Sequence, residues 1–227
     1  MFNKKSLAVA VFFITSVAVC VSATGTFYLP DTELKAYSDK YGDSASRRLS
    51  SLLTLMDSLK DVAEDKKVIK VNSFFNQLRY KTDKANWGKS DYWASRLEFL
   101  GVGRGDCEDY AVAKFLTLLQ LGVPEKKLFL TYVKVKAPKD NRPREFSENS
   151  HMVVTYYKKP GTVPFVLDNY DKKIKPATKR ADLVPVYSFT ANDLFLQKQK
   201  GLGKRVDPSQ SKNVNNLKSV NLEIKKR

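Results

Sequence analysis

Cysteine and histidine are nearly absent from this chain, which has two Cys and one His among 227 residues. A structural zinc site usually takes four Cys or His ligands, so this small supply disfavours one. Any chemistry that needs a thiol or an imidazole must therefore use Cys20, Cys107 or His151.

Cys20 belongs to a segment with the pattern of a secretory signal peptide. Two lysines precede an apolar run over residues 7–21, and Val21-Ser22-Ala23 has the form of a signal peptidase site. An uncleaved membrane anchor is the alternative, but a membrane span needs about 20 apolar residues. Lipid attachment at Cys20 is disfavoured, because Val19 stands where a small residue is expected.

We predict cleavage after Ala23, so that residues 1–23 are a signal peptide. The exported chain then keeps Cys107 as its one cysteine, which excludes an internal disulfide. A lone cysteine in such a protein is a buried small hydrophobe, half of an intermolecular bridge or a reactive thiol. The glycines and acids around Cys107 favour a reactive thiol, because a core cysteine requires neither.

Acidic residues are few compared with basic ones, 24 against 40, which gives a net charge of +16. Residues 198–227 hold nine Lys or Arg and two Asp or Glu, a net charge of +7. With little apolar periodicity, this segment is predicted to be a loosely ordered basic tail. Such a tail favours an anionic membrane surface or an acidic partner, or it is simply solvated. Nucleic acid is not expected as a partner, because the basic residues are not interleaved with aromatic ones.

Apolar periodicity divides the rest of the chain into a helical part and a strand-rich part. Three stripes at helical spacing predict helices within residues 31–79. Alternation of β-forming residues predicts strands at residues 127–135, 151–157, 163–167 and 184–189. Helices first and strands later predict an α+β fold with an antiparallel sheet, in one domain over residues 24–197.

Cys107 is expected to open a helix. Glycines at positions 101, 103 and 105 allow a tight approach of the backbone, and Asp106 is a natural N-cap. An apolar-periodic stretch follows over residues 111–121 and stops at Gly122-Val123-Pro124. The positive end of the helix dipole then favours the thiolate, which is the nucleophilic form of cysteine.

The acidic residues around Cys107 oppose that effect. Asp106, Glu108 and Asp109 raise the pKa of the thiol by like-charge repulsion, so the site needs a compensating cation. A metal ion or a protonated histidine meets this need. The alternative is that these acids only cap the helix and complement its dipole.

His151 supplies a second candidate group, because it opens a predicted strand and Asp168 ends the next one. If the two strands pair, the carboxylate meets the imidazole across the ladder, fixes its tautomer and stabilises its protonated form. Cys107, His151 and Asp168 then meet the physical requirements of a papain-type catalytic set.

Five short motifs surround these residues: Trp93, Leu-Glu-Phe-Leu at residues 97–100, Gly-Asp-Cys-Glu-Asp-Tyr-Ala at 105–111, His-Met-Val-Val at 151–154 and Val-Leu-Asp-Asn at 166–169. Together they resemble the bacterial transglutaminase-like cysteine proteinases of the LapG type, over residues 87–170. The resemblance implies a papain or transglutaminase-like fold. In that fold an N-terminal helical layer and the catalytic helix pack on an antiparallel sheet.

The resemblance also implies an activity and its control. It implies a periplasmic, calcium-dependent cysteine endopeptidase that cuts a large surface adhesin near its N-terminus, at a small-residue site with an Ala-Ala pair, and so releases cells from a biofilm. It implies an inhibitory inner-membrane receptor for cyclic di-GMP, which sequesters the protease in the periplasm.

The calcium ion that the resemblance implies would offset the repulsion between the carboxylates and the thiolate. Asp106 and Glu108 offer hard oxygen ligands, with Asp109 as a further ligand. Backbone carbonyls complete the set, with the loop before His151 as one source.

Two other functions remain open at this stage. One is a different papain-like acyl transfer, such as a peptidoglycan peptidase or a transglutaminase, which shares the thioester chemistry and differs in the acyl acceptor. The other is a non-enzymatic periplasmic scaffold with Cys107 buried. Rapid labelling of the native thiol separates an enzyme from a scaffold.

Overall fold

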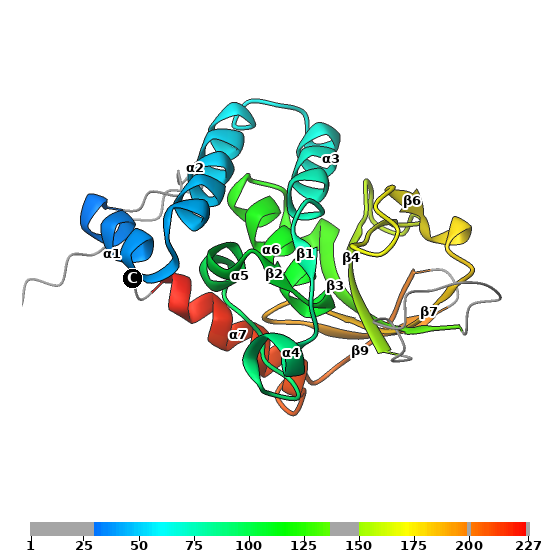
Figure 1. The fold of residues 1–227 in the computed structure, drawn as a ribbon. Coiled ribbons are helices and arrows are strands. Elements are labelled where there is room, and N and C mark those ends of the chain that lie inside the picture. Colours follow the sequence, from blue (N-terminus) through cyan, green and yellow to red (C-terminus); the bar gives the residue numbers. More distant parts are fainter. Residues whose placement is uncertain (1–29, 137–149, 199–200, 226–227) are drawn as a thin grey trace, which may run out of the picture.

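The computed structural model describes residues 30–136, 150–198 and 201–225, with side chains up to residue 220. The predicted signal peptide, residues 1–23, lies outside the described residues, and so does most of the loop before His151. Among the described residues, no helix combines the length and the apolar character needed to cross a membrane. Helices lie on one side of the molecule and a curved sheet on the other (Figure 1).

Three helices form the N-terminal layer, as the apolar stripes predict. They are α1 (Asp31–Tyr41), α2 (Asp43–Ser58) and α3 (Glu64–Phe75). Each helix buries the stripe that predicted it: Tyr37 in α1, Leu49 and Leu52 in α2, Val71 and Phe75 in α3. Burial of such a stripe supplies most of the stability of a short helix, because propensity alone is marginal in water.

A group of short elements leads from this layer to the central helix. They are β1 (Arg79–Tyr80), α4 (Asp83–Trp87), α5 (Arg96–Val102) and β2 (Arg104–Gly105). β1 and β2 pair in parallel, with Tyr80 opposite Gly105. This ladder brings α4 against β2, next to the residues that precede Cys107.

The central helix is α6 (Cys107–Gln120), and ten of its residues, from Asp109 to Leu118, are buried. It packs against α3 and α5 on one side and against β3 and β4 of the sheet on the other. Gly122 follows the helix with a φ of 81°, a left-handed conformation that glycine adopts without strain. The predicted start and stop of this helix are therefore confirmed.

The main sheet has the strand order β6-β5-β4-β3-β7-β8-β9 in the described residues, and every neighbouring pair is antiparallel. The bounds are β3 (Leu128–Val135), β4 (Ser150–Tyr156), β5 (Phe165–Leu167), β6 (Lys175–Pro176), β7 (Leu183–Phe189), β8 (Leu194–Lys198) and β9 (Gly201–Val206). Short 3-10 turns lie at Glu125–Lys127 and Ala177–Lys179. The α+β class and the four predicted strands, β3, β4, β5 and β7, are confirmed.

The pairing of β4 with β5 decides where the candidate site residues lie. Val154 is opposite Leu167 in this ladder, so Asp168 follows directly after the last paired residue of β5. His151 lies further along β4, opposite Val133 of β3. The two candidate residues therefore come from neighbouring strands at the same end of the sheet.

The prediction of a loosely ordered tail over residues 198–227 is wrong for the described residues. They form β9 and the helix α7 (Lys212–Lys225), whose first residues bind Asp91 and Tyr187 of β7; Figure 1 shows α7 in red. Val214, Leu217 and Val220 are buried, and the first two belong to the main hydrophobic core. The apolar positions are sparse, but their spacing of three places them on one helical face.

We expect Leu217→Ala to destabilise the protein. Leu217 is fully buried, and truncation of a buried leucine to alanine costs about 2–5 kcal/mol in the free energy of unfolding. Thermal unfolding checks this result, with the neighbouring exposed Lys218→Ala as the control. Equal melting temperatures for the two variants would mean that α7 does not contribute to the core.

Candidate active site

Cys107 is the first residue of α6, with Asp106 at the N-cap, as the sequence predicts. The carboxylate of Asp109 accepts hydrogen bonds from the backbone N–H of Ala94 at 2.8 Å and of Asp106 at 3.3 Å. A Cβ at Gly105 would lie 2.2 Å from an Asp109 oxygen, so this position requires glycine. The start of α6 is thus fixed by Asp109, in space that Gly105 leaves free.

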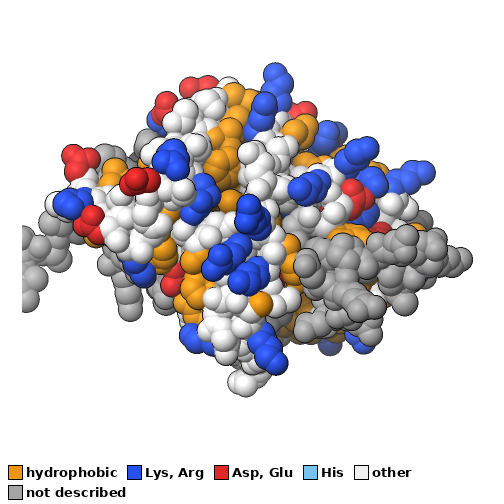
Figure 2. Space-filling view, in the orientation of Figure 1, with side chains coloured by type: hydrophobic (Ala, Val, Ile, Leu, Met, Phe, Trp, Pro, Cys, Tyr) orange, Lys and Arg blue, Asp and Glu red, His pale blue; other side chains and the backbone are white. Residues whose placement is uncertain are grey.

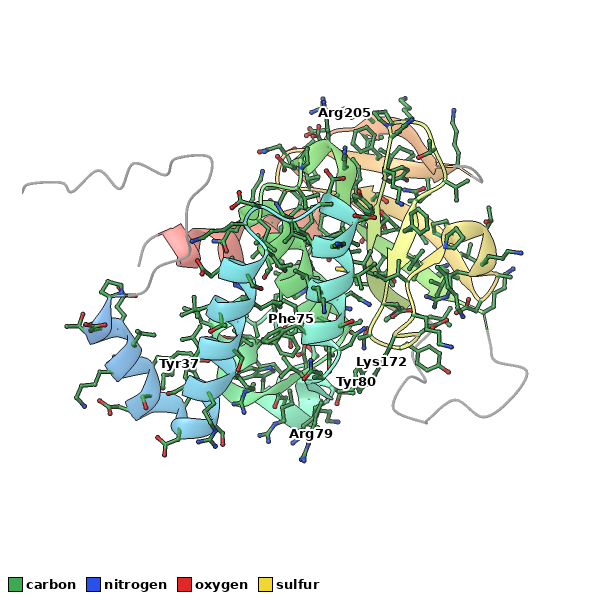
Figure 3. All side chains as sticks on the ribbon, turned by 90° about the horizontal axis from the view of Figure 1, so that it is seen from above. Tyr37, Phe75, Arg79, Tyr80, Lys172 and Arg205 are labelled. Atoms are coloured by element: carbon green, nitrogen blue, oxygen red, sulfur yellow. The ribbon has the colours of Figure 1, made fainter. Side chains whose placement is uncertain are left out.

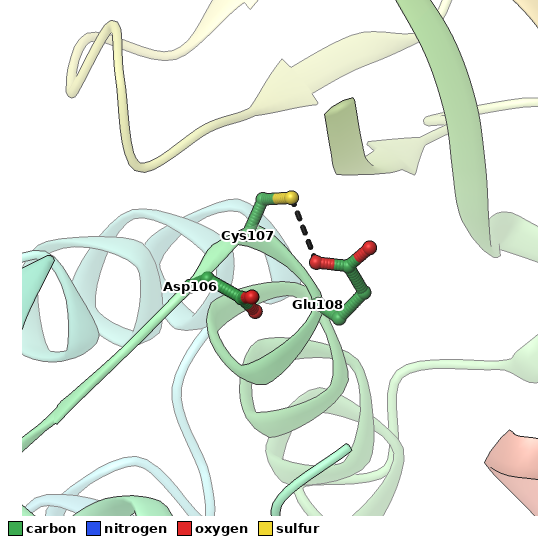
Figure 4. A group of neighbouring side chains, drawn as sticks. All are labelled: Asp106, Cys107 and Glu108. Carbon is green, nitrogen blue, oxygen red and sulfur yellow. Dashed lines mark hydrogen bonds between the residues drawn. The ribbon is translucent and has the colours of Figure 1, made fainter. Parts of the chain in front are cut away.

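The Cys107 thiol lies between Glu108 and strand β4. It donates a hydrogen bond to Glu108 Oε2 at 2.8 Å (Figure 4). Burial raises the pKa of the Cys107 thiol well above its usual value, and the charges of Glu108 and Asp106 raise it further. The backbone N–H of Met152 in β4 faces the sulfur and lowers the pKa. The predicted conflict between the thiolate and its acidic neighbours is therefore present in the fold.

His151 and Asp168 form a buried hydrogen-bonded pair, as strand pairing predicts. His151 Nε2 lies 2.8 Å from Asp168 Oδ1. Because Nε2 is taken by the carboxylate, Nδ1 is the ring nitrogen that can exchange a proton with another group. The next residue of β4, Met152, faces the Cys107 sulfur. The strand therefore brings the imidazole to the end of α6 that carries the thiol.

Asp168 is held by more groups than the sequence analysis identified. Arg180 Nη2 donates to Asp168 Oδ2 at 2.7 Å, and the backbone N–H of Tyr170 donates to Oδ1 at 2.9 Å. Asn76, the C-cap residue of α3, donates to the carbonyl of Asp168 at 2.8 Å. Burial raises the pKa of Asp168, but His151 and Arg180 outweigh it and hold that pKa well below the usual range. Asp168 is therefore ionised at neutral pH, as a partner of a protonated imidazole must be.

Arg180 and Asn76 were missed because no motif marks them. Arg180 also donates to Asp182, at 3.0 Å and 2.9 Å, so one guanidinium bridges two carboxylates. A planar, permanently charged group suits this double role. Arg180 is a positioning residue for Asp168 and does not itself face the thiol in any contact of the described residues.

We expect Arg180→Gln to reduce both stability and any activity that depends on His151. Its side chain is 3% exposed and that of Asp168 is fully buried, and removal of one partner of a buried ion pair costs about 3–5 kcal/mol. Asp182→Asn is the matched control, since it removes the more exposed partner of the same guanidinium. Differential scanning calorimetry and kcat/KM measure the two effects. Similar losses in both variants would show that the Arg180–Asp168 pair has no special role.

A cluster of carboxylates lies beside the thiol. Oxygens of Asp83, Asp106 and Asp109 lie within 4.8 Å of one another, and Asp106, Cys107 and Glu108 form an overlapping group of the same kind. Oδ1 of Asp83 and Oδ1 of Asp106 are buried without a hydrogen-bond partner among the described residues. Burial, with the charges of Glu108 and Asp109, raises the pKa of Asp106 to about 11. Burial likewise raises the pKa of Asp83 and of Asp109.

This cluster fits a hard divalent cation. Such cations take carboxylate oxygens as ligands, and a positive charge here would offset the repulsion that holds protons on the acids. Of the acids predicted from the sequence, Asp106 and Glu108 flank the thiol, while Asp109 shares the second group with Asp83. Asp83 was not predicted, because the β1–β2 ladder that brings α4 to this place is a long-range contact. Most of the loop before His151, predicted as a ligand source, lies outside the described residues.

A helix that begins with a cysteine, packed against an antiparallel sheet that carries a His–Asp pair, defines a cysteine protease of the papain and transglutaminase-like class. The family model described as bacterial transglutaminase-like cysteine proteinase matches residues 53–184. The chain belongs to this family, which confirms the resemblance seen in the sequence motifs.

Solved structures of LapG from Legionella pneumophila are similar to the chain over most of its length. The calcium-bound form is 34% identical, with a TM-score of 0.67, and the match covers 84% of this chain and 98% of that one. The EGTA-treated form is 35% identical, with a TM-score of 0.69 and coverage of 85% and 98%. A third LapG structure has 34% identity, a TM-score of 0.66 and coverage of 86% and 98%. No curated protein sequence matches the chain.

Proposed function

We propose that the protein is a calcium-dependent cysteine endopeptidase whose catalytic triad is Cys107, His151 and Asp168. The observation that carries the proposal is the buried His151–Asp168 hydrogen bond of 2.8 Å, next to Met152, whose backbone N–H faces the Cys107 sulfur. A scaffold protein has no need for a thiol at a helix start, for a histidine fixed through Nε2, or for a buried carboxylate kept ionised by an arginine. These features together favour an enzyme.

Cys107 supplies the first nucleophile, water supplies the second, and His151 carries the proton in each step. His151 takes the proton of Cys107 at Nδ1, and the thiolate attacks the carbonyl carbon of the scissile peptide. A C–S bond forms as the carbonyl π electrons move to oxygen; when they return, the C–N bond breaks and His151 protonates the departing amine. Water, deprotonated at the same nitrogen, then hydrolyses the thioester and restores the thiol. Asp168 keeps Nε2–H oriented and stabilises the imidazolium in both halves.

Asp83, Asp106, Glu108 and Asp109 are the residues that would hold calcium. The proposal is supported by the two buried carboxylate oxygens without a partner and by the raised pKa of Asp106. It is also supported by similarity to a LapG structure that is calcium-bound. When bound, calcium supplies the positive charge that offsets the carboxylates beside the Cys107 thiol.

The finer parts of the proposal come from the resemblance to the LapG type. We propose that the protein is exported to the periplasm by a cleaved signal peptide, residues 1–23. There it cuts the N-terminal region of a large surface adhesin and promotes biofilm release. An inner-membrane receptor for cyclic di-GMP inhibits it through its periplasmic domain. Contact of basic residues in 198–227 with an anionic membrane surface stays a proposal as well.

Incubation with candidate substrates tests the proposed function. Purified protein without residues 1–23 is mixed with N-terminal fragments of large adhesins from the same genome, in calcium and in EGTA. We expect a single cut near a pair of small residues, in calcium only. Equal cleavage in calcium and in EGTA would show that the protease does not require the metal. Transfer of the acyl group to an added amine instead of water would indicate a transglutaminase.

We expect Asp168→Asn to lower kcat by about 10²–10⁴-fold, a large loss but a smaller one than removal of the thiol. Asparagine keeps a hydrogen bond to His151 but loses the charge that stabilises imidazolium, and its amide nitrogen would face the Arg180 donor. Asp171→Asn is the matched control, because Asp171 pairs with Lys175 at 2.6 Å and does not contact His151. Steady-state kinetics on the cleaved fragment decide the matter, and a wild-type rate would assign Asp168 a structural role.

A further inference from the structure

An apolar groove of about 440 Å³ lies between α3 and the chain that leads from Asp168 into β6. Val68 and Ile69 of α3 line one side, and Phe165 and Ile174 line the other. Ile69 is 52% exposed, which is unusual for a large aliphatic side chain on a helix that otherwise buries its apolar stripe. The groove thus exposes apolar side chains among polar ones, so an apolar side chain of a ligand can pack there.

A buried polar group at this groove lacks a partner. Asn72 of α3 is 1% exposed and lines the groove. Its Nδ2 donates to the carbonyl of Lys172 at 3.0 Å, but its Oδ1 has no hydrogen-bond partner in the described part of the chain. This oxygen is itself buried, so Asn72 acts at the groove by holding the carbonyl of Lys172 and not as a contact for an occupant.

The charged residues of the groove are mostly basic. Lys158, Lys172 and Lys173 line it, against one acid, Asp65. None of these lysines forms an ion pair with a carboxylate among the described residues, and Lys158 Nζ lies 5.3 Å from the centre of the Phe165 ring. Figure 2 shows basic side chains gathered over the face that carries α3 and the chain before β6, with apolar atoms between them. The groove therefore suits a ligand that is both acidic and apolar.

We propose that this groove is an exosite, which binds an extended acidic segment of the protein substrate away from the bond that is cut. The proposal rests on the proposed function, since the substrate supplies the segment. A peptide meets both features of the groove: carboxylates for the lysines and alternate apolar side chains for the floor. A phosphate surface meets the first feature but offers no apolar side chain.

The exosite is connected to the active site through one loop. Asn72 donates to the carbonyl of Lys172, and Asn76, the C-cap residue of α3, donates to the carbonyl of Asp168 at 2.8 Å. Lys172 lies beside the C-terminal half of α3 (Figure 3). A segment in the groove therefore contacts the loop that holds Asp168, and one substrate chain can occupy both sites. Binding here lowers KM for a long substrate more than it changes kcat.

Fluorescence anisotropy tests the exosite on the Cys107→Ala protein, which cannot cut its ligand. The probe is a short fluorescein-labelled peptide in which Glu and Val alternate. Two peptides are its controls: one in which Gln replaces Glu, and one in which Ser replaces Val. We expect saturable binding of the acidic peptide, and at least about tenfold weaker binding of each control, because each loses one class of contact.

Charge-reversal variants test whether the acidic peptide binds in this groove. Lys172→Glu combined with Lys173→Glu is expected to weaken binding of the acidic peptide at least about tenfold. Lys66→Glu combined with Lys70→Glu is the matched control, because these exposed lysines lie on α3 but do not line the groove. We expect it to change the affinity less than about twofold.

Several results overturn the exosite. They are the absence of peptide binding, equal binding of the Gln peptide, equal losses in both double variants, and binding to phosphatidylglycerol vesicles without binding to the peptide. If adhesin fragments are cut but the Lys172→Glu, Lys173→Glu protein has an unchanged KM for them, the exosite proposal is wrong and the protease proposal is supported. If the peptide binds as described but no fragment is cut, the proposed protease function fails while the groove remains a peptide site.

Discussion

Replacing Cys107 by alanine is expected to abolish peptide-bond cleavage and to leave the fold intact. Loss of the nucleophile in a protease lowers kcat by about 10⁶-fold, because the remaining groups cannot form the covalent intermediate. No other cysteine of the described residues can replace it. Cleavage is measured on an adhesin fragment by gel electrophoresis, and folding by thermal unfolding in the same buffer.

His151→Ala is the companion variant, because the thiol and the imidazole act as a unit. Its loss should nearly equal that of Cys107→Ala, and the double variant should be no worse than either single one. Iodoacetamide labelling adds a measurement that is independent of any substrate. Burial and the charges of Glu108 and Asp106 raise the pKa of the thiol. Because calcium would offset those two charges, the thiol should react faster in calcium than in EGTA. Substantial turnover by either single variant, or an inert thiol in calcium, would remove Cys107 and His151 from the catalytic role.

Removal of calcium is expected to lower activity and thermal stability together. Asp83, Asp106 and Asp109 bring carboxylate oxygens within 4.8 Å of one another, so a divalent cation relieves their repulsion and pins the turn before α6. A ligand that binds the folded state alone stabilises it by about 2.7 kcal/mol at 100 times its Kd. The melting temperature should therefore rise with calcium concentration, as measured by calorimetry against the same protein in EGTA.

Variants separate a specific calcium site from a general effect of ionic strength. Asp106→Ala and Glu108→Ala should lose the calcium-dependent melting shift and most activity. Asp57→Asn is the control, because Asp57 is a surface acid that pairs with Lys60. Magnesium at equal concentration should give a smaller shift than calcium, because it needs shorter, octahedral coordination. Full activity of the EGTA-treated protein with unchanged melting would leave the acids as helix caps only.

In EGTA, the protonated carboxyl of Asp106 is expected to make the folded protein less stable as the pH rises. A carboxyl whose pKa is about 11 in the folded protein, against about 4 when unfolded, holds its proton better in the folded state. Its contribution to stability is therefore full below about pH 4 and is lost as the pH rises toward the folded pKa. Asp106→Asn should remove this loss of stability. Without calcium, the variant should therefore gain stability relative to wild type as the pH rises from 5 to 8. This is roughly the range in which the unfolded carboxyl is already ionised and the folded one is not.

Much of the site could be predicted because its parts are marked locally. The N-cap Asp106, the glycines before Cys107 and the apolar spacing after it all act within a few residues of one another, and they fix the start of α6. His151 and Asp168 were predictable for a similar reason, since antiparallel neighbours that follow each other in the chain pair by default, and β4 and β5 do.

The tail could not be predicted correctly from composition. Nine basic residues among 198–227 suggested a solvated arm, but charge does not prevent a helix from burying one face. Val214 and Leu217 lie in the main core because α7 packs its apolar face against it. Its apolar positions are too few for a strong local signal, and their burial depends on a surface formed by residues far away in the chain.

The sequence by itself determined the local framework of this protein: the helical first part, the strand-rich second part, and a thiol at a helix start among acids that repel its charged form. Only the tertiary structure decided which distant groups complete the site. The β1–β2 ladder brings Asp83 into the carboxylate cluster. The turn after β6 places Arg180 in contact with Asp168. Periodicity and capping act over a few residues, whereas ion pairing and metal ligation depend on distances in space that packing alone sets.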